Sequence, residues 1–305
     1  MKSVQPLVDT PSASGLRIDV NATRLLRILR IGVAMCFIGH GAFGVVTKEA
    51  WVPYFAVAGI SEVWAWRLMP LVGTMDIAIG FLALIWPCRA IFAWAAIWAT
   101  WTALLRPLAG QGWSEFFERA GNYGIALGAL AIVGLSAPWF SRIPEEWPAI
   151  SDEVNKRLAW TLRIATATLL AGHAGLAVFL QKGSLEDQYA ILTAENTTAL
   201  MLSVGYFEFV LAAAVLVTSL PFVFVFVAIW KVVTEALILS TDVPAPMFEV
   251  IERGGSYLVP LALALLYWSV RKQPDRSKIG WQLPFFGAGP DGPRGARRIR
   301  SYGNG

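Results

Sequence analysis

The chain has 305 residues, of which 56% are hydrophobic and 15% are charged, and its mean hydropathy is +0.56. Soluble domains carry about a quarter charged residues, so this composition excludes a soluble globular protein and indicates an integral membrane protein in a lipid bilayer. The net charge of +4 comes from basic residues in loops and tails beside apolar segments. Orientation in the bilayer explains that distribution better than nucleic acid binding, so no nucleic acid partner is expected.

Eight apolar segments follow a polar, flexible arm at residues 1–22. Each has about 20 residues, the length that crosses a bilayer, and must be helical there to satisfy its own backbone hydrogen bonds. The segments lie near 25–46, 68–87, 90–109, 121–141, 160–180, 199–218, 221–240 and 255–271. The sequence therefore predicts an all-α integral membrane protein with eight transmembrane helices.

The connections between these spans differ in length. Cys88-Arg89 separates the second span from the third, and Ser219-Leu220-Pro221 separates the sixth from the seventh, which predicts two tight antiparallel hairpins. The loops at 47–67 and 181–198 are longer, and tryptophans in the first are typical of the membrane interface. The tail at 273–305 is rich in Gly, Pro and Arg, and we expect a disordered basic arm attracted to anionic lipid head groups.

Lys and Arg residues lie mainly on one side of the predicted bundle. The side that holds both termini has 18 of them, whereas the opposite side has six, together with ten acidic residues. Basic residues favour the cytoplasmic side of a membrane. We therefore expect both termini in the cytoplasm and a net negative outer face.

The sequence repeats itself at an offset of 132 to 134 residues. The motif E-x-x-E-R-x-G-x-Y occurs at 115–123 and again at 249–257, on the predicted outer side. Three more patterns recur in the same order. Arg30-Ile followed by His40 recurs as Arg163-Ile followed by His173, Gly73 followed by Asp76 recurs as Gly205 followed by Glu208, and Ala96-Ile-Trp98 recurs as Ala228-Ile-Trp230. We expect two tandem four-helix units, 23–141 and 159–272, joined by a cytoplasmic linker at 142–158. Because each unit has an even number of spans, a pseudo-twofold axis should run along the membrane normal.

His40 and His173 are the two histidines of the chain, and they occupy equivalent positions in equivalent spans. Small residues flank each one, and such residues let another helix or a flat cofactor come close. We expect both in the outer half of the membrane, at the depth of Asp76 and Glu208. Ionisable residues inside a membrane are costly and face the bundle interior or a wet cavity, so these four residues are candidates for a functional site.

Three interpretations of the histidines remain open. In the first, each ring bonds the acid of its own unit and only fixes helix packing, because buried polar groups normally find partners. In the second, histidine, acid and Glu-Arg motif line a pocket that binds or protonates a small ligand such as a quinone, since a histidine beside an acid can handle protons near neutral pH. In the third, His40 and His173 ligate one haem b iron across the pseudo-twofold axis.

The charged residues of the repeated motif are further candidates. Glu118 and Arg119 stand in the first copy, and Glu252 and Arg253 stand in the second. As ion pairs on the outer surface they would contribute little to stability. The arginines can instead anchor an anionic group, and the sequence leaves both interpretations open.

Lys231 and Glu235 lie four residues apart, and hence on one helix face, where the first unit has Ala99 and Ala103. We favour an internal ion pair that neutralises two buried charges over a transport relay. The asymmetry marks the second unit as the better candidate if only one unit carries chemistry.

Motifs of metal and hydrolase chemistry are missing from the sequence. Cys36 lies four residues before His40, but no further Cys or His is available nearby, and zinc or copper sites need three or four such ligands. No metal site is expected. There is also no phosphate-binding Gly loop, no zinc-protease motif and no nucleophile elbow, so the sequence does not establish whether the protein is an enzyme.

Short motifs in the first half form a recognisable series: Pro53-Tyr54-Phe55 with Gly59-Ile60, Asp76-Ile-Ala-Ile-Gly80, Pro87-Cys88-Arg89 and Phe117-Glu118-Arg119. In these motifs each half resembles the DoxX family of four-span bacterial membrane proteins. The second half keeps Glu208 and Arg253 but has neither the Pro nor the Arg of the corner. The chain departs from the family in being duplicated and in having Asp76 where Glu is usual.

The resemblance implies a bacterial cytoplasmic membrane and a redox setting, because the related DoxD proteins are implicated as membrane subunits of a thiosulfate:quinone oxidoreductase. Fold-level analogy supplies no reaction by itself. The leading hypothesis is an accessory or quinone-interacting subunit of a membrane redox system, with a membrane or peripheral redox protein as partner. A small-solute or ion transporter and a purely structural subunit of a larger complex are the alternatives.

Overall fold

The computed structural model describes residues 20–148, 150–193 and 195–271, and these residues form helices and no strand. Most of the predicted arm at 1–22 and all of the predicted tail at 273–305 lie outside them. The helices are α1 (Val20–Val45), α2 (Val52–Val57), α3 (Glu62–Ile85), α4 (Arg89–Leu108), α5 (Trp113–Glu118), α6 (Ala120–Val133), α7 (Asp152–Val178), α8 (Gly183–Ala190), α9 (Thr197–Val217), α10 (Pro221–Ala236), α11 (Pro246–Glu252) and α12 (Gly254–Arg271), with 3₁₀ turns η1 (Glu49–Trp51) and η2 (Leu237–Ser240).

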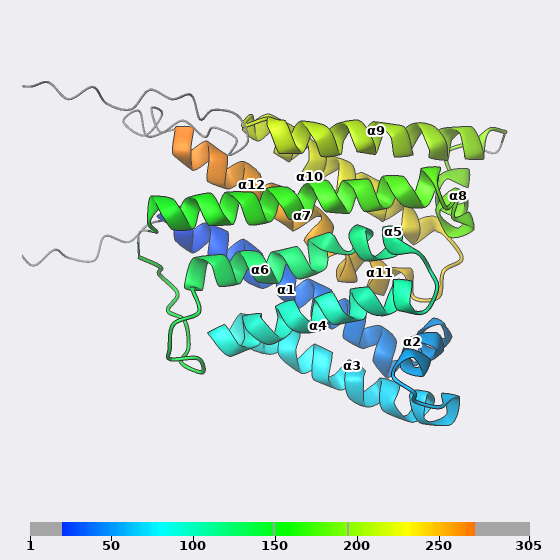
Figure 1. Ribbon diagram of the computed structural model, residues 1–305, viewed down its shortest axis with the longest axis horizontal. Helices are drawn as coiled ribbons and strands as arrows, with labels where there is room; N and C mark the ends of the chain where they lie inside the picture. The colour runs from blue at the N-terminus through cyan, green and yellow to red at the C-terminus, as the bar shows by residue number, and fades with distance from the viewer. Residues whose placement is uncertain (1–19, 149, 194, 272–305) are drawn as a thin grey trace, which may run out of the picture.

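Seven helical stretches within the described residues are long and apolar enough to cross a membrane. They are Ala22–Val45, Glu62–Ile85, Arg89–Leu108, Asp152–Val178, Thr197–Val217, Pro221–Ser240 and Pro246–Ser269. The longer helices run side by side in one bundle (Figure 1). The prediction of an all-α, multi-pass membrane protein is confirmed at this level.

The span predicted at 121–141 is shorter in the structure. It corresponds to α6, which ends at Val133, because Gly134 takes a positive φ of 69° that a helix does not continue through. The 14 residues of α6 rise about 21 Å at 1.5 Å per residue, less than the hydrocarbon core of about 30 Å. By length this helix is not one of the seven candidate spans.

Both long loops of the sequence contain short helices. In the stretch 47–67, η1 and α2 form first, and Pro53 stands in the first turn of α2, where its missing N–H costs nothing. The helix α3 then begins at Glu62, earlier than the predicted 68, with an acidic residue in the first turn where the helix dipole favours it. In the stretch 181–198, α8 takes the corresponding place.

Glycines let the helices of each half approach closely. A Cβ atom on Gly44 of α1 would lie 2.7 Å from the Cα atom of Gly73 of α3, so both backbones meet at this point. Small residues allow this kind of contact between membrane helices. The pairs α1–α3 and α7–α9 are the most extensive helix contacts, one in each half of the chain.

The two halves meet through the short helices that carry the repeated motif. The helix α5 of the first half packs on α7 of the second, and α11 of the second packs on α1 of the first. Beside them α6 and α12 cross, with a Cβ on Gly121 calculated to lie 2.7 Å from the carbonyl carbon of Gly255. The halves therefore exchange their motif helices.

Two buried arginines hold the ends of neighbouring helices. Arg30 of α1 donates to the carbonyl oxygens of Ala83 and Leu84 at the end of α3, at 3.2 and 2.5 Å. Arg163 of α7 donates to the last carbonyls of α9 at 2.8 and 2.7 Å and also to the Tyr267 hydroxyl. Cations are favourable at helix C-termini, where carbonyl groups lack helical partners. The repeated Arg-Ile pattern therefore has a structural role.

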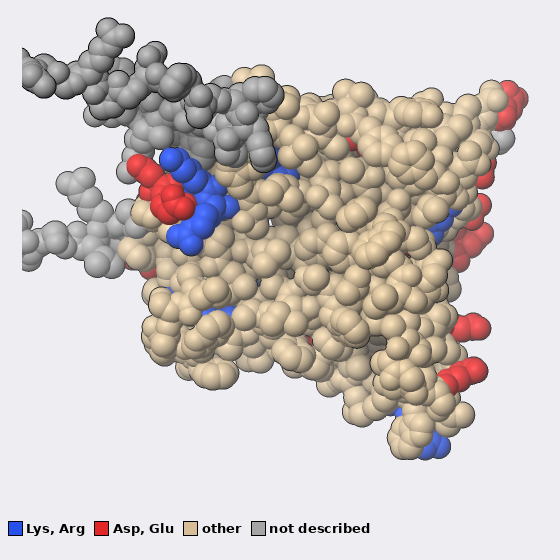
Figure 2. All heavy atoms as spheres, viewed as in Figure 1, with Lys and Arg blue, Asp and Glu red and all other residues tan. Residues whose placement is uncertain are grey.

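Charge is concentrated at the ends of the bundle on the face seen in Figure 2. Acidic side chains gather at the end where α2 and α8 lie, while a broad and largely uncharged band covers the middle. Exposed apolar side chains such as Leu71, Ile97 and Val210, each about two-thirds exposed, lie on the candidate spans. Such a surface suits the hydrocarbon of a bilayer.

Candidate functional site

Each histidine lies against the acid of its own half. The Nδ1 atom of His40 on α1 is 2.7 Å from Oδ2 of Asp76 on α3. The Nδ1 atom of His173 on α7 is 2.6 Å from Oε2 of Glu208 on α9. Both acids are fully buried, but the side chain of His40 is 19% exposed and that of His173 only 3%. The difference in exposure arises from a cavity in the first half.

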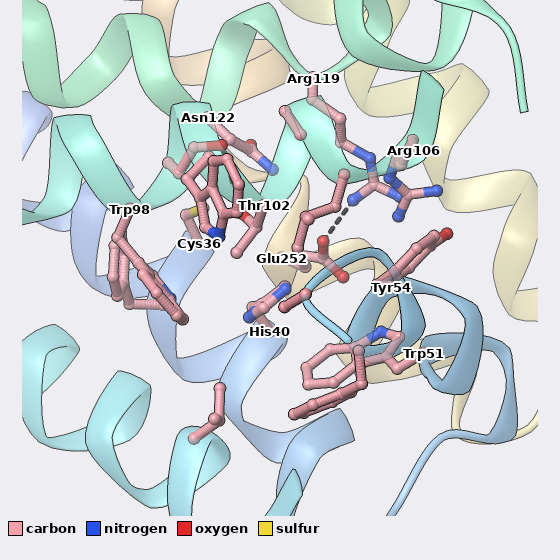
Figure 3. A pocket seen from close by; sticks show the side chains of 18 of the residues that line it. Cys36, His40, Trp51, Tyr54, Trp98, Thr102, Arg106, Arg119, Asn122 and Glu252 are labelled. Carbon is pink, nitrogen blue, oxygen red and sulfur yellow. Dashed lines mark hydrogen bonds and ion pairs between the residues drawn. The ribbon is translucent and has the colours of Figure 1, made fainter. Parts of the chain in front are cut away.

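This cavity encloses about 280 Å³ beside His40 and lies between α1, α2, α3 and α4. The His40 ring stacks on Trp51, with ring centroids 4.4 Å apart and an interplanar angle of 27°. Trp98 lies on the opposite side of the cavity in Figure 3. Because Nδ1 of His40 is engaged with Asp76, its Nε2 is the ring atom left for a ligand.

The mouth of the cavity lies between α3 and α4. Leu71 of α3 is 66% exposed and Trp101 of α4 is 41% exposed, and both line the cavity. Ala58, just after α2, is exposed at the same rim. Since α3 and α4 are candidate spans with largely exposed apolar faces, the cavity opens through the side of the bundle.

Two buried polar atoms near the cavity have no hydrogen-bond partner in the protein: Oδ1 of Asp76 and Nε1 of Trp98. Buried polar groups normally have partners, and an unpaired one costs about 1–3 kcal/mol. Trp98 itself lines the cavity, and Asp76 holds the His40 ring that faces it. A bound molecule with an acceptor would give Nε1 of Trp98 a partner at the cavity wall, whereas Asp76 does not itself line the cavity.

The corresponding polar atoms of the second half are paired. Oε1 of Glu208 accepts a hydrogen bond from Nε1 of Trp230 at 3.0 Å and lies 3.6 Å from Nζ of Lys231. That ammonium is in turn 3.0 Å from Oε1 of Glu235. Lys231 and Glu235 therefore form the internal pair that the four-residue spacing favours, and both are buried.

The charged residues of the repeated motif form one buried cluster. Arg119 donates a hydrogen bond to Glu252, and Arg253 donates one to Glu118, so each copy of the motif bonds the other. Glu118 is 3% and Glu252 4% exposed. The interpretation of these groups as outer-surface ion pairs is wrong, because the exchange of α5 and α11 places them between the two halves.

This cluster reaches both histidine sites. Glu252 and Arg119 line the cavity beside His40, as Figure 3 shows. On the other side, Arg253 lies 3.2 Å from Oε2 of Glu235. The motif copy of one half thus contributes to the site of the other half, which the linear order of the sequence does not indicate.

Arginines control the ionisation of Glu118 in α5. Burial alone would raise the pKa of this carboxyl, but Arg253 and Arg119 outweigh it and hold the pKa well below its ordinary value. Glu118 is therefore ionised across the neutral and mildly acidic range, and it keeps the cluster charged.

The geometry does not fit a haem shared by His40 and His173. A Cβ on Gly39 would lie 2.3 Å from the backbone nitrogen of Glu252, and one on Gly172 would lie 2.1 Å from that of Glu118. The backbone of a neighbouring helix therefore packs directly against the glycines beside the histidines. No space is left there for a haem macrocycle. Among the described residues no three His, Cys, Asp or Glu side chains are placed to hold a metal ion.

Sequence reasoning missed several residues of the cavity. The sequence indicates an interfacial position for the tryptophans of the loop 47–67, but Trp51 of that loop lines the cavity, together with Tyr54 and Trp98. So do Cys36, which is buried and free, and Thr102, Arg106 and Asn122. The Trp98–Trp230 match in the repeat was the one signal that could have drawn attention to a tryptophan at this site.

The chain matches no protein-family model, no curated protein and no solved structure. The geometry and the sequence motifs therefore carry the functional argument.

Proposed function

We propose that the first-half cavity binds the ring of a quinone, and that the protein is a quinone-interacting subunit of a membrane redox system. The observation that carries the proposal is the position of His40. Its ring is held by Asp76, stacked on Trp51 and directed at a cavity open to the side of the bundle. A cavity of about 280 Å³ is close to the lower end of small-molecule sites, about 300 Å³, which suits one substituted ring.

The walls match a flat molecule with few polar groups. Trp51 and Trp98 present aromatic surface, and aromatic rings favour stacked or edge-on contact. The polar groups of the lining include Nε2 of His40, Nε1 of Trp98 and the hydroxyl of Thr102, beside the paired charges of Arg119 and Glu252. A quinone ring has apolar faces and oxygen atoms at its edge, which meet these two kinds of group.

The lateral mouth suits a ligand that arrives from the bilayer. Leu71 and Trp101 rim an opening between two helices whose outer faces are apolar. An isoprenoid tail can remain among the lipid chains while the ring enters between α3 and α4. A ligand restricted to water would have no reason to use this route.

The protein's own residues would supply positioning and a proton. His40 can donate from Nε2 to a quinone oxygen or accept a proton there from a hydroquinone hydroxyl, with Asp76 stabilising the charged ring. Interconversion of quinone and hydroquinone moves two electrons and two protons. His40 exchanges one of the two protons, and the two electrons and the second proton are exchanged with a partner redox protein, which is the role we assign to the partner.

The topology belongs to the same proposal. We infer that α6 takes the place of a fourth span in the first half, as α12 does in the second, which gives eight crossings in two related units. The distribution of basic residues supports cytoplasmic termini, and with that orientation we infer that the cavity lies in the outer half of a bacterial cytoplasmic membrane. The DoxX resemblance is part of this inference and rests on the sequence motifs alone.

Ion or solute transport is the second candidate. A continuous series of buried charges links the two sites, in the order His173, Glu208, Lys231, Glu235, Arg253, Glu118, Arg119 and Glu252. Intramembrane charges of this kind mark ion pathways in other membrane proteins. Proteoliposomes that show no proton or solute uptake, or uptake unchanged by Glu235→Gln, would remove this candidate.

Equilibrium binding tests the quinone proposal. The purified full chain in nanodiscs is titrated with decylubiquinone and with a short-chain menaquinone, and bound quinone is measured after separation. We expect one molecule per chain, with affinity at least about tenfold weaker in His40→Gln and unchanged in the matched variant His173→Gln. Absence of binding to the wild-type chain, or equal loss in both variants, would reject the proposal.

A further inference from the structure

We infer that the second half contains a counterpart of the quinone cavity that its own side chains Lys231 and Glu235 fill, so that one chain holds one open site and one self-occupied site. The identity of the ligand rests on the proposed function. The existence of the filled cavity rests on the packing of the second half and can be tested without any quinone.

Sequence correspondence places the two filling residues at the cavity. Ala99 and Ala103 of α4 line the first-half cavity, and their methyl groups leave its centre empty. The offset of 132 residues that matches Trp98 with Trp230 matches these alanines with Lys231 and Glu235. The two long side chains therefore project from the positions at which the first half has almost no side chain.

Four polar residues of the lining are preserved in the second half, where they are closed off. His173, Thr234, Arg253 and Glu118 stand where the first-half cavity has His40, Thr102, Arg119 and Glu252. His173, Thr234 and Glu118 are each no more than 3% exposed, and Lys231 and Glu235 are no more than 1% exposed. Leu169 of α7 stands where the first-half cavity has Cys36, and this larger side chain is fully buried.

The filling side chains are held by ion pairs with the charges around them. The Lys231 ammonium lies 3.6 Å from Oε1 of Glu208 and 3.0 Å from Oε1 of Glu235. The Glu235 carboxylate lies 3.2 Å from Arg253. In the first half, Ala99 and Ala103 place no charged side chain beside the matching Asp76 and Arg119, so the space stays open.

The first-half cavity itself indicates what its ligand should present. Its donor should face Nε2 of His40, and its acceptor should face Nε1 of Trp98, which has no partner. A hydroxyl and a second oxygen on one ring satisfy both positions, which favours a hydroquinone over the oxidised quinone in the resting site.

The double variant Lys231→Ala/Glu235→Ala tests the inference. It gives the second half the alanines of the first and removes both partners of the ion pair, while Glu208 keeps His173 and Arg253 keeps Glu118 as a partner. We expect bound hydroquinone, measured with reduced decylubiquinone under anaerobic conditions, to rise from one to two molecules per chain. A value that stays at one, in a variant with wild-type helix content and elution volume, would overturn the inference.

A variant that keeps the side-chain volume distinguishes the effect of filling the cavity from the effect of the two charges. Lys231→Met/Glu235→Gln removes the ion pair but keeps side chains of similar length, so the cavity should stay filled and the stoichiometry should remain one. Two bound molecules in this control would mean that charge, and not volume, closes the second site, which would also overturn the inference. The reverse change Ala99→Lys/Ala103→Glu should reduce binding in the first half by at least about tenfold, and unchanged binding would count against the inference.

The accessibility of an introduced thiol tests for the filled cavity without any ligand, and the test compares two variants so that it does not depend on the folding of one. Leu169→Cys is introduced after Cys36→Ala and Cys88→Ala, and labelling by N-ethylmaleimide in membranes is followed with time. We expect labelling at least about tenfold faster with Lys231→Ala/Glu235→Ala than with Lys231→Met/Glu235→Gln. If the wild-type chain binds no quinone but labelling follows this pattern, the proposed function is rejected and the inference of a filled cavity is kept. Equal labelling rates in the two variants would reject the inference of a filled cavity.

Discussion

Arg119 donates a hydrogen bond to Glu252, which lies 133 residues later in the chain, and this contact brings one copy of the repeated motif against the other. Arg253 makes the reciprocal contact with Glu118. Because Glu252 also lines the cavity beside His40, the second half forms part of the first-half site. The site consequently needs both halves, and stability and ligand binding should depend on the same four charges.

Arg119→Ala should destabilise the protein strongly. It leaves Glu252 buried without the guanidinium that neutralises it, and removing one partner of a buried ion pair costs about 3–5 kcal/mol. Thermal unfolding in detergent, followed by circular dichroism, measures the effect. The control is Arg157→Ala, since Arg157 and Glu153 form an exposed pair 3.8 Å apart, and such pairs contribute little. Similar losses in both variants would contradict the buried cluster.

Glu118 should determine part of the acid sensitivity. Its pKa in the folded protein lies well below the ordinary value of 4.5, because the attraction of Arg253 and Arg119 exceeds the cost of burial. A depressed pKa contributes stability above the unfolded-state pKa, and that contribution is lost as pH falls through the folded-state pKa. We expect Glu118→Gln to be less stable than wild type at pH 7 and to lose less stability on acidification below about pH 4.5.

Unfolding midpoints of wild type and Glu118→Gln between pH 3 and pH 7 measure this difference. Glu186→Gln is the control, since Glu186 lies on α8 outside the cluster. Parallel pH profiles for wild type and Glu118→Gln would show that the two arginines do not stabilise the ionised form of Glu118.

Arg163→Met should loosen the end of α9. Arg163 is 4% exposed and donates to two terminal carbonyls and to Tyr267, and each bond from a charged group contributes about 1.5–3 kcal/mol. Hydrogen exchange should accelerate in Ala214–Val217 and much less in α3, whose end Arg30 holds. The exposed Arg27 supplies the control Arg27→Met, and equal exchange in both variants would exclude a capping role.

Local sequence rules were sufficient for the pairings within each half. Apolar length predicted the long helices, and the four-residue spacing predicted that Lys231 and Glu235 meet. The shared membrane depth of His40 and Asp76 indicated that they are neighbours, which the 2.7 Å contact bears out. These contacts follow from helical periodicity and from the cost of burying a charge without a partner.

Contacts between the halves did not follow from such rules. The exchange of α5 and α11 depends on how α6 and α12 cross at Gly121 and Gly255, which is a property of the packed bundle. The cavity also depends on η1 and α2 folding back so that Trp51 reaches His40. Hydropathy assigns a tryptophan in such a loop to the membrane interface, because it does not register tertiary contacts.

Trp51→Leu should weaken quinone binding without removing the cavity. Trp51 is 6% exposed and stacks on the His40 ring, so leucine removes aromatic contact from His40 and from the quinone that we propose binds beside it. Aromatic pairs contribute about 0.5–1.5 kcal/mol beyond burial, and a loss of about 1 kcal/mol corresponds to roughly fivefold weaker binding. The matched control is Trp64→Leu, because Trp64 is 55% exposed at the start of α3 and does not line the cavity. Titration of both variants with decylubiquinone in nanodiscs measures the difference, and an unchanged affinity in Trp51→Leu would place the quinone away from the His40 ring.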